Sequence, residues 1–195
     1  MSTLDFGPAT TTAAQVVAGI RDDQLGDPSP CPDYTVADLL DHMYGLSFAF
    51  TAAALKKPLT DPGPSGDSSR LPDDWREAIP AALAGLAAAW RDTPGAFEGT
   101  TQAGPIEMPA PEAALVALNE VVVHGWDLAA ATGQPYPADP AAVAAARQFV
   151  ESFEPPADES PDDPGLFGPP VAVPDDAPEL HRLLGATGRR PDWTP

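Results

Sequence analysis

Apolar residues recur at helical spacing along most of the chain, and this pattern predicts an all-α fold. The clearest stripe lies in the third predicted helix, where large apolar residues fall three or four positions apart and share one face. Its members are Trp75, Ile79, Leu83, Leu86 and Trp90. Pro80 lies within this stripe, so we expect either a kink there or a helix that begins near Ile79.

The other helices are predicted from the same spacing together with helix start and stop signals. Residues 97–108 interrupt the helical pattern and predict a short extended excursion, a minor hairpin around Gly104. The polar, proline-rich stretches 59–71 and 154–164 predict loops, and residues 165–174 predict extended chain. In chain order, the predicted helices span about residues 8–23, 35–57, 75–93, 111–132, 139–153 and 176–186.

The second predicted helix has a strong start signal. Thr35 and Asp38 form a variant of the capping box, in which each side chain accepts a hydrogen bond from the backbone N–H of the other residue. The cap fixes the register of the helix. His42 therefore lies on an apolar face, which it shares with Leu39 and Leu46.

The fourth predicted helix organises the rest of the chain. Between residues 113 and 131 nearly every side chain is Ala, Leu or Val, and a helix that is apolar on all sides is a buried helix. Its only ionisable side chains are Glu120, His124 and Asp127, and the first two lie one turn apart on the same face. A buried carboxylate and imidazole cost several kcal/mol unless a partner compensates them.

Two kinds of partner would compensate Glu120 and His124. The first is structural: the two form a hydrogen-bonded pair, or a nearby carbonyl satisfies the histidine. The second is a divalent cation, which both side chains can reach from positions i and i+4. His42 favours the cation, because it places a second histidine on the apolar face of a separate helix. Two histidines and one glutamate would leave coordination positions open, as catalytic zinc sites do.

The residue types do not fix the metal. Two histidines and one carboxylate suit zinc, the same set suits iron(II), and nickel also stays open. Asp127 is a candidate to accept a hydrogen bond from an imidazole N–H and so to orient a metal-binding histidine without binding the metal itself. His181 is predicted to be a surface or groove residue. Cys31, alone in a proline-rich loop without an adjacent base, is predicted to be unreactive.

Composition restricts the partners and the location. The formal net charge is −19 with only ten Lys and Arg residues, so neither nucleic acid nor an anionic membrane is expected as a partner. One cysteine allows no intrachain disulfide, and no signal peptide is visible, so we expect a cytoplasmic protein. The 195 residues predict one domain, with a core bundle at about 5–135 and C-terminal helices and an extended tail at about 136–195.

Several motifs resemble a known family. Residues 29–42 (SPCPDYTVADLLDH) and 120–128 (EVVVHGWDL), with 167–176 and 190–194, are similar to actinobacterial metal-binding proteins of the DinB-like superfamily. These proteins are related to the N-terminal domain of mycothiol-dependent maleylpyruvate isomerase. The resemblance implies a four-helix bundle with additional short C-terminal helices and little or no strand. It also implies a divalent metal, commonly zinc, bound by His42, Glu120 and His124.

The resemblance implies a function as well. We expect a metal-dependent transferase or isomerase that uses a low-molecular-weight thiol such as mycothiol and acts on a small electrophile. The alternative is a non-catalytic metal-binding or stress-associated helical module, with His181, Cys31 or a loop aspartate closing the metal site. The oligomeric state stays open, with a homodimer as one option. Arg76, Arg91 and Arg147 are candidates for a substrate-binding arginine, although none lies in a matching motif.

Overall fold

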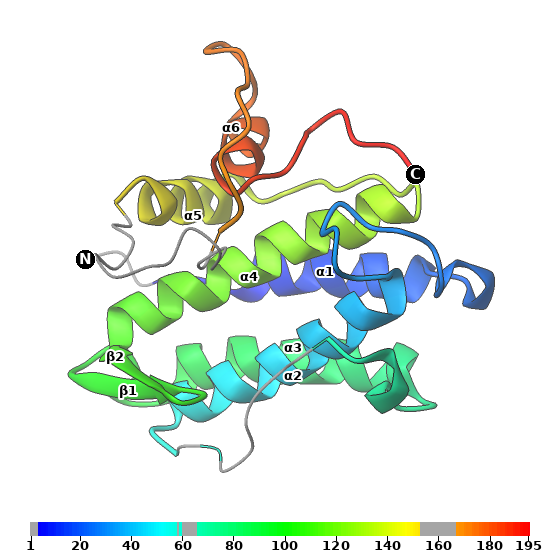
Figure 1. The fold of residues 1–195 in the computed structure, drawn as a ribbon. Helices are drawn as coiled ribbons and strands as arrows, with labels where there is room; N and C mark the ends of the chain where they lie inside the picture. Colours follow the sequence, from blue (N-terminus) through cyan, green and yellow to red (C-terminus); the bar gives the residue numbers. More distant parts are fainter. Residues whose placement is uncertain (1–3, 58, 60–65, 153–166) are drawn as a thin grey trace.

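A computed structural model describes residues 4–57, 59, 66–152 and 167–195 of the chain, which form helices and one short hairpin (Figure 1). The predicted all-α class is therefore confirmed. The elements are α1 (Gly7–Gly19), a 3-10 turn (Asp22–Gln24), α2 (Val36–Ala54), a second 3-10 turn (Ser68–Arg70), α3 (Trp75–Asp92), β1 (Thr100–Ala103), β2 (Ile106–Pro109), α4 (Ala110–Ala131), α5 (Pro140–Ser152) and α6 (Glu179–Ala186).

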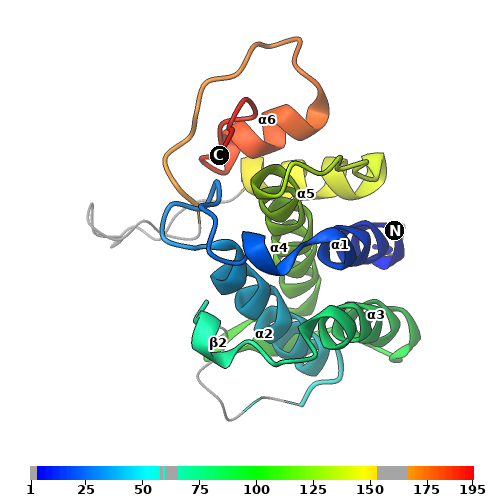
Figure 2. The same cartoon turned by 90° about the vertical axis from the view of Figure 1, so that its right-hand side faces the viewer.

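Helices α1 to α4 form a four-helix bundle. Helix α1 packs against α3 and α4, and α2 packs against the same two helices, so the four surround one core. Outside the bundle, α5 packs on α4 and α6 packs on α5, so the two C-terminal helices extend the bundle on one side (Figure 2). The predicted bundle with additional short C-terminal helices is confirmed.

Helix α4 is the most enclosed element, because α1, α2 and α5 all pack against it. Its core residues include Leu118, Val122 and Leu128, each no more than 1% exposed. Among the described residues, α4 is the one helix long and apolar enough to cross a membrane by length and composition, with a mean hydropathy of 1.2. Since 83% of that stretch is buried inside the protein, its position in the core accounts for its apolar character.

The observed helix boundaries differ from the predicted ones by three or more residues at the end of α1, at the end of α2, which is Ala54 rather than residue 57, and at the start of α6. Helix α1 ends at Gly19, and the chain forms a 3-10 turn where the prediction continued the helix. Helix α6 begins at Glu179, because Pro178 disfavours helical backbone in the residue before it. Of the two possibilities predicted at Pro80, a helix that begins near Ile79 is wrong, since α3 begins at Trp75, as the predicted span 75–93 does, and includes Pro80. The kink at Pro80 stays a prediction.

The interruption predicted at residues 97–108 is an antiparallel hairpin of β1 and β2. Gly104 in its turn has a positive φ of 59°, a conformation that favours glycine. The hydroxyl of Thr101 donates a hydrogen bond of 2.6 Å to the carbonyl of Ala53, which ties the hairpin to the end of α2. Strand β2 leads directly into α4, so the hairpin positions the start of that helix. The predicted loop 154–164, and residues 60–65 of the predicted loop 59–71, lie outside the described residues.

The capping box at the start of α2 is confirmed. The backbone N–H of Thr35 donates to Oδ2 of Asp38 at 3.0 Å, and the backbone N–H of Asp38 donates to Oγ1 of Thr35 at 3.3 Å. Oδ1 of Asp38 also accepts the backbone N–H of Ser68 at 2.8 Å, which ties the second 3-10 turn to α2. The first turn of α2, which precedes His42, is therefore fixed by hydrogen bonds.

Replacing the capping hydroxyl tests this local interaction. We expect Thr35→Ala to lower the free energy of unfolding by about 1 kcal/mol, the usual cost of losing an N-cap side chain. Urea denaturation followed by circular dichroism measures this change. Thr35→Ser keeps the hydroxyl and should retain most of the stability. Equal unfolding midpoints for Thr35→Ala and the wild type would contradict the role of this cap.

Candidate metal centre

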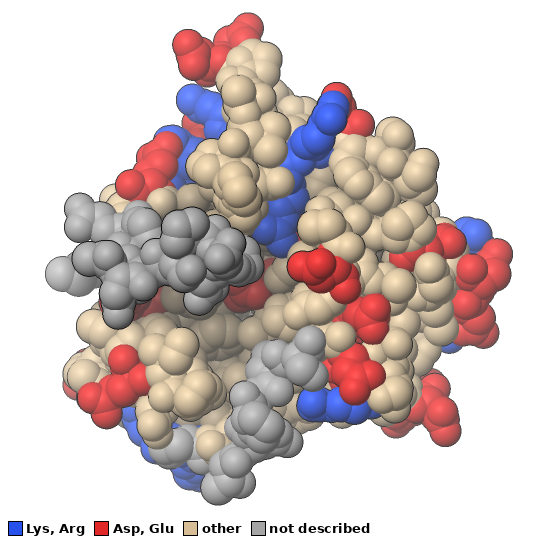
Figure 3. All heavy atoms as spheres, viewed as in Figure 1, with Lys and Arg blue, Asp and Glu red and all other residues tan. Residues whose placement is uncertain are grey.

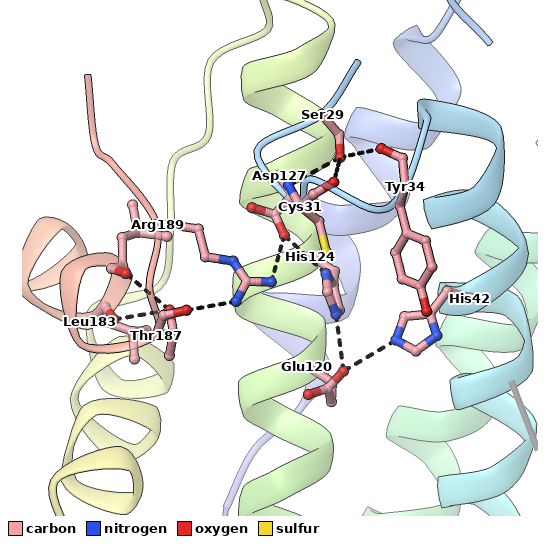
Figure 4. Close-up of polar contacts among 11 residues, drawn as sticks. Ser29, Cys31, Tyr34, His42, Glu120, His124, Asp127, Leu183, Thr187 and Arg189 are labelled. Carbon is pink, nitrogen blue, oxygen red and sulfur yellow. Dashed lines mark hydrogen bonds and ion pairs between the residues drawn. The ribbon is translucent and has the colours of Figure 1, made fainter. Parts of the chain in front are cut away.

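Three predicted ligands from two helices meet in the core. Nε2 of His124 lies 3.1 Å from Oε2 of Glu120, and Nε2 of His42 lies 3.5 Å from the same oxygen (Figure 4). Potential ligand atoms of all three residues lie within 4.8 Å of one another. Because Glu120 and His124 are on α4 and His42 is on α2, the group joins two helices that pack against each other.

The two imidazole rings face the glutamate from different directions. Their centroids are 4.9 Å apart and their planes are perpendicular, so the rings do not stack. The ring of Tyr34 lies 5.4 Å from that of His42. Nδ1 of His42 is buried and has no hydrogen-bond partner in the described part of the chain. Each histidine thus directs Nε2 towards the glutamate carboxylate.

Asp127 contacts the opposite nitrogen of His124. Its Oδ2 lies 3.0 Å from Nδ1 of His124, and the aspartate is fully buried (0% exposed). A carboxylate at Nδ1 holds a proton on that nitrogen, which fixes the ring orientation and leaves Nε2 to serve as a ligand. The contact is the one that the orienting role of Asp127 requires, and the role itself stays a prediction.

The carboxylates of Glu120 and Asp127 contact His124 from its two ring nitrogens, and they favour a positive charge between them. Burial alone would lower the pKa of His124, but the charge of Glu120 and the hydrogen bond to Asp127 outweigh it and raise the pKa to about 9. Burial would raise the pKa of Glu120, but the histidines hold it well below its usual range. In the metal-free protein a proton on His124 supplies the charge. A divalent cation bound by His42, Glu120 and His124 would supply it instead, so the donor set fits a metal ion.

A pocket of about 510 Å³ lies over the three residues, and all three line it. Its walls come from the loop at residues 30–34, from α4, and from residues 167–169 and 187–189 of the C-terminal segment. Figure 3 shows a hollow at the centre of this face of the molecule, among scattered acidic side chains. The candidate metal centre is therefore accessible to a small molecule.

No predicted candidate for a fourth ligand (His181, Cys31 or a loop aspartate) joins the group in the described part of the chain. Within the described residues the clustered ligand atoms belong to His42, Glu120 and His124 alone. Cys31 lines the same pocket, and burial raises the pKa of its thiol to about 11, against the opposing charge of Arg189. This shift agrees with the expectation that the thiol is unreactive. His181 lines a different pocket, beside Val173 and Arg190, as expected for a groove residue.

The arginine of this pocket was not predicted from the sequence. Nη2 of Arg189 lies 3.1 Å from Oδ2 of Asp127. The sequence candidates pair elsewhere: Arg76 with Asp22, Arg91 with Asp92, and Arg147 with Glu151 and Glu179. The one local signal near Arg189 was Gly188, which predicts the end of α6. Nothing in the sequence pairs Arg189 with a residue 62 positions earlier.

The fold and the site define a helical bundle with a candidate metal centre between two of its helices. The family model for the mycothiol maleylpyruvate isomerase N-terminal domain matches residues 6–129, and the chain belongs to this family. The predicted resemblance is therefore confirmed.

Two relatives and one solved structure are similar to this chain. The uncharacterized proteins Rv0738 and MT0763, from two strains of Mycobacterium tuberculosis, are each 34% identical over 157 residues, covering 76% of this chain and 81% of theirs. The crystal structure of the mycothiol-dependent maleylpyruvate isomerase matches with a TM-score of 0.55 and 18% identity. The match covers 73% of this chain and 63% of that one. At this identity the likeness supports the fold alone.

The raised pKa of His124 predicts how the metal-free protein responds to pH. A group whose pKa is higher in the folded state adds stability that is complete below its unfolded pKa, 6.5 for this histidine, and is lost as the pH rises through about 9. We therefore expect the free energy of unfolding, measured with urea in the presence of a chelator, to fall between pH 6.5 and about 8.5.

His124→Gln should reduce this fall, whereas His181→Gln, a change outside the site, should keep it. The window stays below about pH 9 because the shifted titration of Cys31 adds its own pH dependence only above its ordinary pKa of 9.0. Identical pH dependence in the wild type and His124→Gln would contradict the charge assigned to this histidine.

Proposed function

We propose that this protein binds a divalent metal, with zinc as the favoured ion, and uses a low-molecular-weight thiol such as mycothiol to transform a small electrophile by transfer or isomerisation. The observation that carries the proposal is the convergence of His42, Glu120 and His124 on a pocket of about 510 Å³. That volume lies within the range of small-molecule sites. Three ligands without a fourth are typical of catalytic zinc rather than structural zinc.

Each residue of the group has a defined role in this proposal. His42, Glu120 and His124 would hold the ion, and Asp127 keeps the proton of His124 on Nδ1 through the 3.0 Å contact. A divalent ion lowers the pKa of a thiol that it coordinates, so that the thiolate is present at neutral pH. The thiolate could then attack an electrophilic carbon, either for transfer or for cis–trans isomerisation through a covalent adduct.

The pocket supplies the groups that would position the thiol and the electrophile. Val123 and Pro30 form apolar parts of the wall. Asn119 also lines the pocket and is 2% exposed, and its Oδ1 has no hydrogen-bond partner within the described residues. An unpaired buried carboxamide oxygen is costly unless it is used, so we assign it to accept a hydrogen bond from a bound ligand.

The alternative function is a non-catalytic metal-binding module. An ion held by His42 from α2 and by Glu120 and His124 from α4 would join two packed helices and stabilise the folded state. A third interpretation, in which Glu120 and His124 pair with each other and bind no metal, explains the 3.1 Å contact between them. It gives no reason for His42 to approach the same carboxylate oxygen from another helix, and this approach favours the metal-binding proposals.

A thiol-consumption assay tests the catalytic proposal. Zinc-loaded protein is incubated with mycothiol and a panel of small electrophiles, including activated cis-alkenes, and loss of thiol or of the cis isomer is followed. We expect turnover by the wild type and background rates for His124→Ala, because this change removes a metal ligand. His181→Ala, at a histidine outside the site, should keep the wild-type rate.

The two proposed functions give different results in this assay. Inactivity of the zinc-loaded wild type against the whole panel, with the metal still bound, would contradict the catalytic proposal. The same outcome, together with a melting temperature that rises on addition of zinc, would support the non-catalytic module.

A further inference from the structure

Arg189 contacts Asp127, the neighbour of a candidate metal ligand, from a part of the chain that the family model does not match, since that match ends at residue 129. Oδ2 of Asp127 accepts one hydrogen bond from Nη2 of Arg189 at 3.1 Å and lies 3.0 Å from Nδ1 of His124 (Figure 4). A single carboxylate oxygen therefore links a residue of the C-terminal segment to a candidate metal ligand.

The backbone around Arg189 is fixed by the end of α6. The N–H of Gly188 donates to the carbonyl of Gly185 at 3.2 Å, and the N–H of Arg189 donates to the carbonyl of Leu184 at 2.8 Å. This pair of hydrogen bonds is the Schellman motif, with Gly188 in the left-handed conformation at a φ of 82°. A side chain at Gly188 would also lie 3.0 Å from the backbone of Gly168. The motif thus sets the point from which the arginine side chain leaves.

The guanidinium group of Arg189 binds two acceptors at once. Nη1 donates to the carbonyl of Thr187 at 2.8 Å while Nη2 contacts Asp127, and the side chain is 12% exposed. The Thr187 hydroxyl donates in turn to the carbonyls of Leu183 and Leu184. A planar fork of donors suits this bridge, whereas a lysine ammonium, a single point charge, does not reproduce it.

Two groups hold the carboxylate of Asp127, and both contact the same oxygen. Its second oxygen, Oδ1, has no hydrogen-bond partner within residues 4–57, 59, 66–152 and 167–195. Only Oδ2 is held, by His124 of the same helix and by Arg189. Without the arginine, the buried carboxylate would lose its cationic neighbour and could rotate away from the imidazole.

We propose that Arg189 is a positioning residue of the metal centre, which holds Asp127 against Nδ1 of His124 and makes metal affinity depend on docking of the C-terminal segment. This inference rests on the metal-binding part of the proposed function. It assigns Arg189 no contact with the ion. Residues that orient a metal-binding histidine typically change metal affinity by about 10- to 100-fold when they are replaced.

Zinc affinity of the full-length protein, measured by competition with a chromophoric chelator, tests the proposal. We expect Arg189→Gln to weaken zinc binding by about 10- to 100-fold. Arg190→Gln is the matched control: the adjacent arginine is 68% exposed, pairs with Asp192, and should bind zinc as the wild type does. If Arg189→Gln does not fold by circular dichroism, Arg189→Lys replaces it, and its zinc affinity should also fall because lysine cannot bridge both acceptors.

A double-mutant comparison separates this role from general stabilisation. If Arg189 acts through Asp127, adding Arg189→Gln to Asp127→Asn should weaken zinc binding little beyond Asp127→Asn alone. Additive losses, or wild-type zinc affinity in a folded Arg189→Gln protein, would overturn the inference and leave the proposed function standing. Absence of zinc binding by the wild type would overturn both.

Discussion

The compensation of charges on one buried helix is the constraint on which the site depends. Helix α4 carries Glu120, His124 and Asp127 in a core of Ala, Leu and Val, where an uncompensated charge is strongly destabilising. The compensation comes from three directions: His42 on α2, Arg189 from the C-terminal segment, and a proton or a metal ion at the centre. The packing of α2 on α4 and the return of the C-terminal segment both bring these partners to α4.

Much of the bundle and the convergence of the three candidate ligands could be predicted from local patterns. The apolar stripe of the third helix and the almost entirely apolar fourth helix indicated core faces. Thr35 and Asp38 fixed the register of α2, and this register places His42 opposite Glu120. Spacing within one turn of α4 related Glu120 to His124. These features could be predicted because each depends on residues close in sequence. The approach of His42 is the exception, and it was indicated by the apolar faces that the two helices share.

The outer part of the site could not be predicted in the same way. Arg189 and Arg190 are adjacent and chemically identical, yet one is 12% exposed against Asp127 and the other is 68% exposed beside Asp192. The difference arises from the Schellman motif at the end of α6 and from packing that joins residues 62 positions apart. The sequence also left two possibilities at Pro80, and a start near Ile79 is excluded because Pro80 is accommodated inside α3 while Trp75 and Ile79 pack in the core.

Elemental analysis of untagged protein, purified without a metal-affinity resin, most directly tests whether α2 and α4 bind a common ion. The wild type, His42→Ala and His124→Ala are each reconstituted with zinc or iron(II), dialysed, and analysed for metal per chain. We expect about one ion per chain in the wild type and a large loss in both variants, because each change removes one of three ligands. Two results would contradict a metal centre at His42, Glu120 and His124. One is no retained metal in the wild type, and the other is as much metal per chain in both variants as in the wild type.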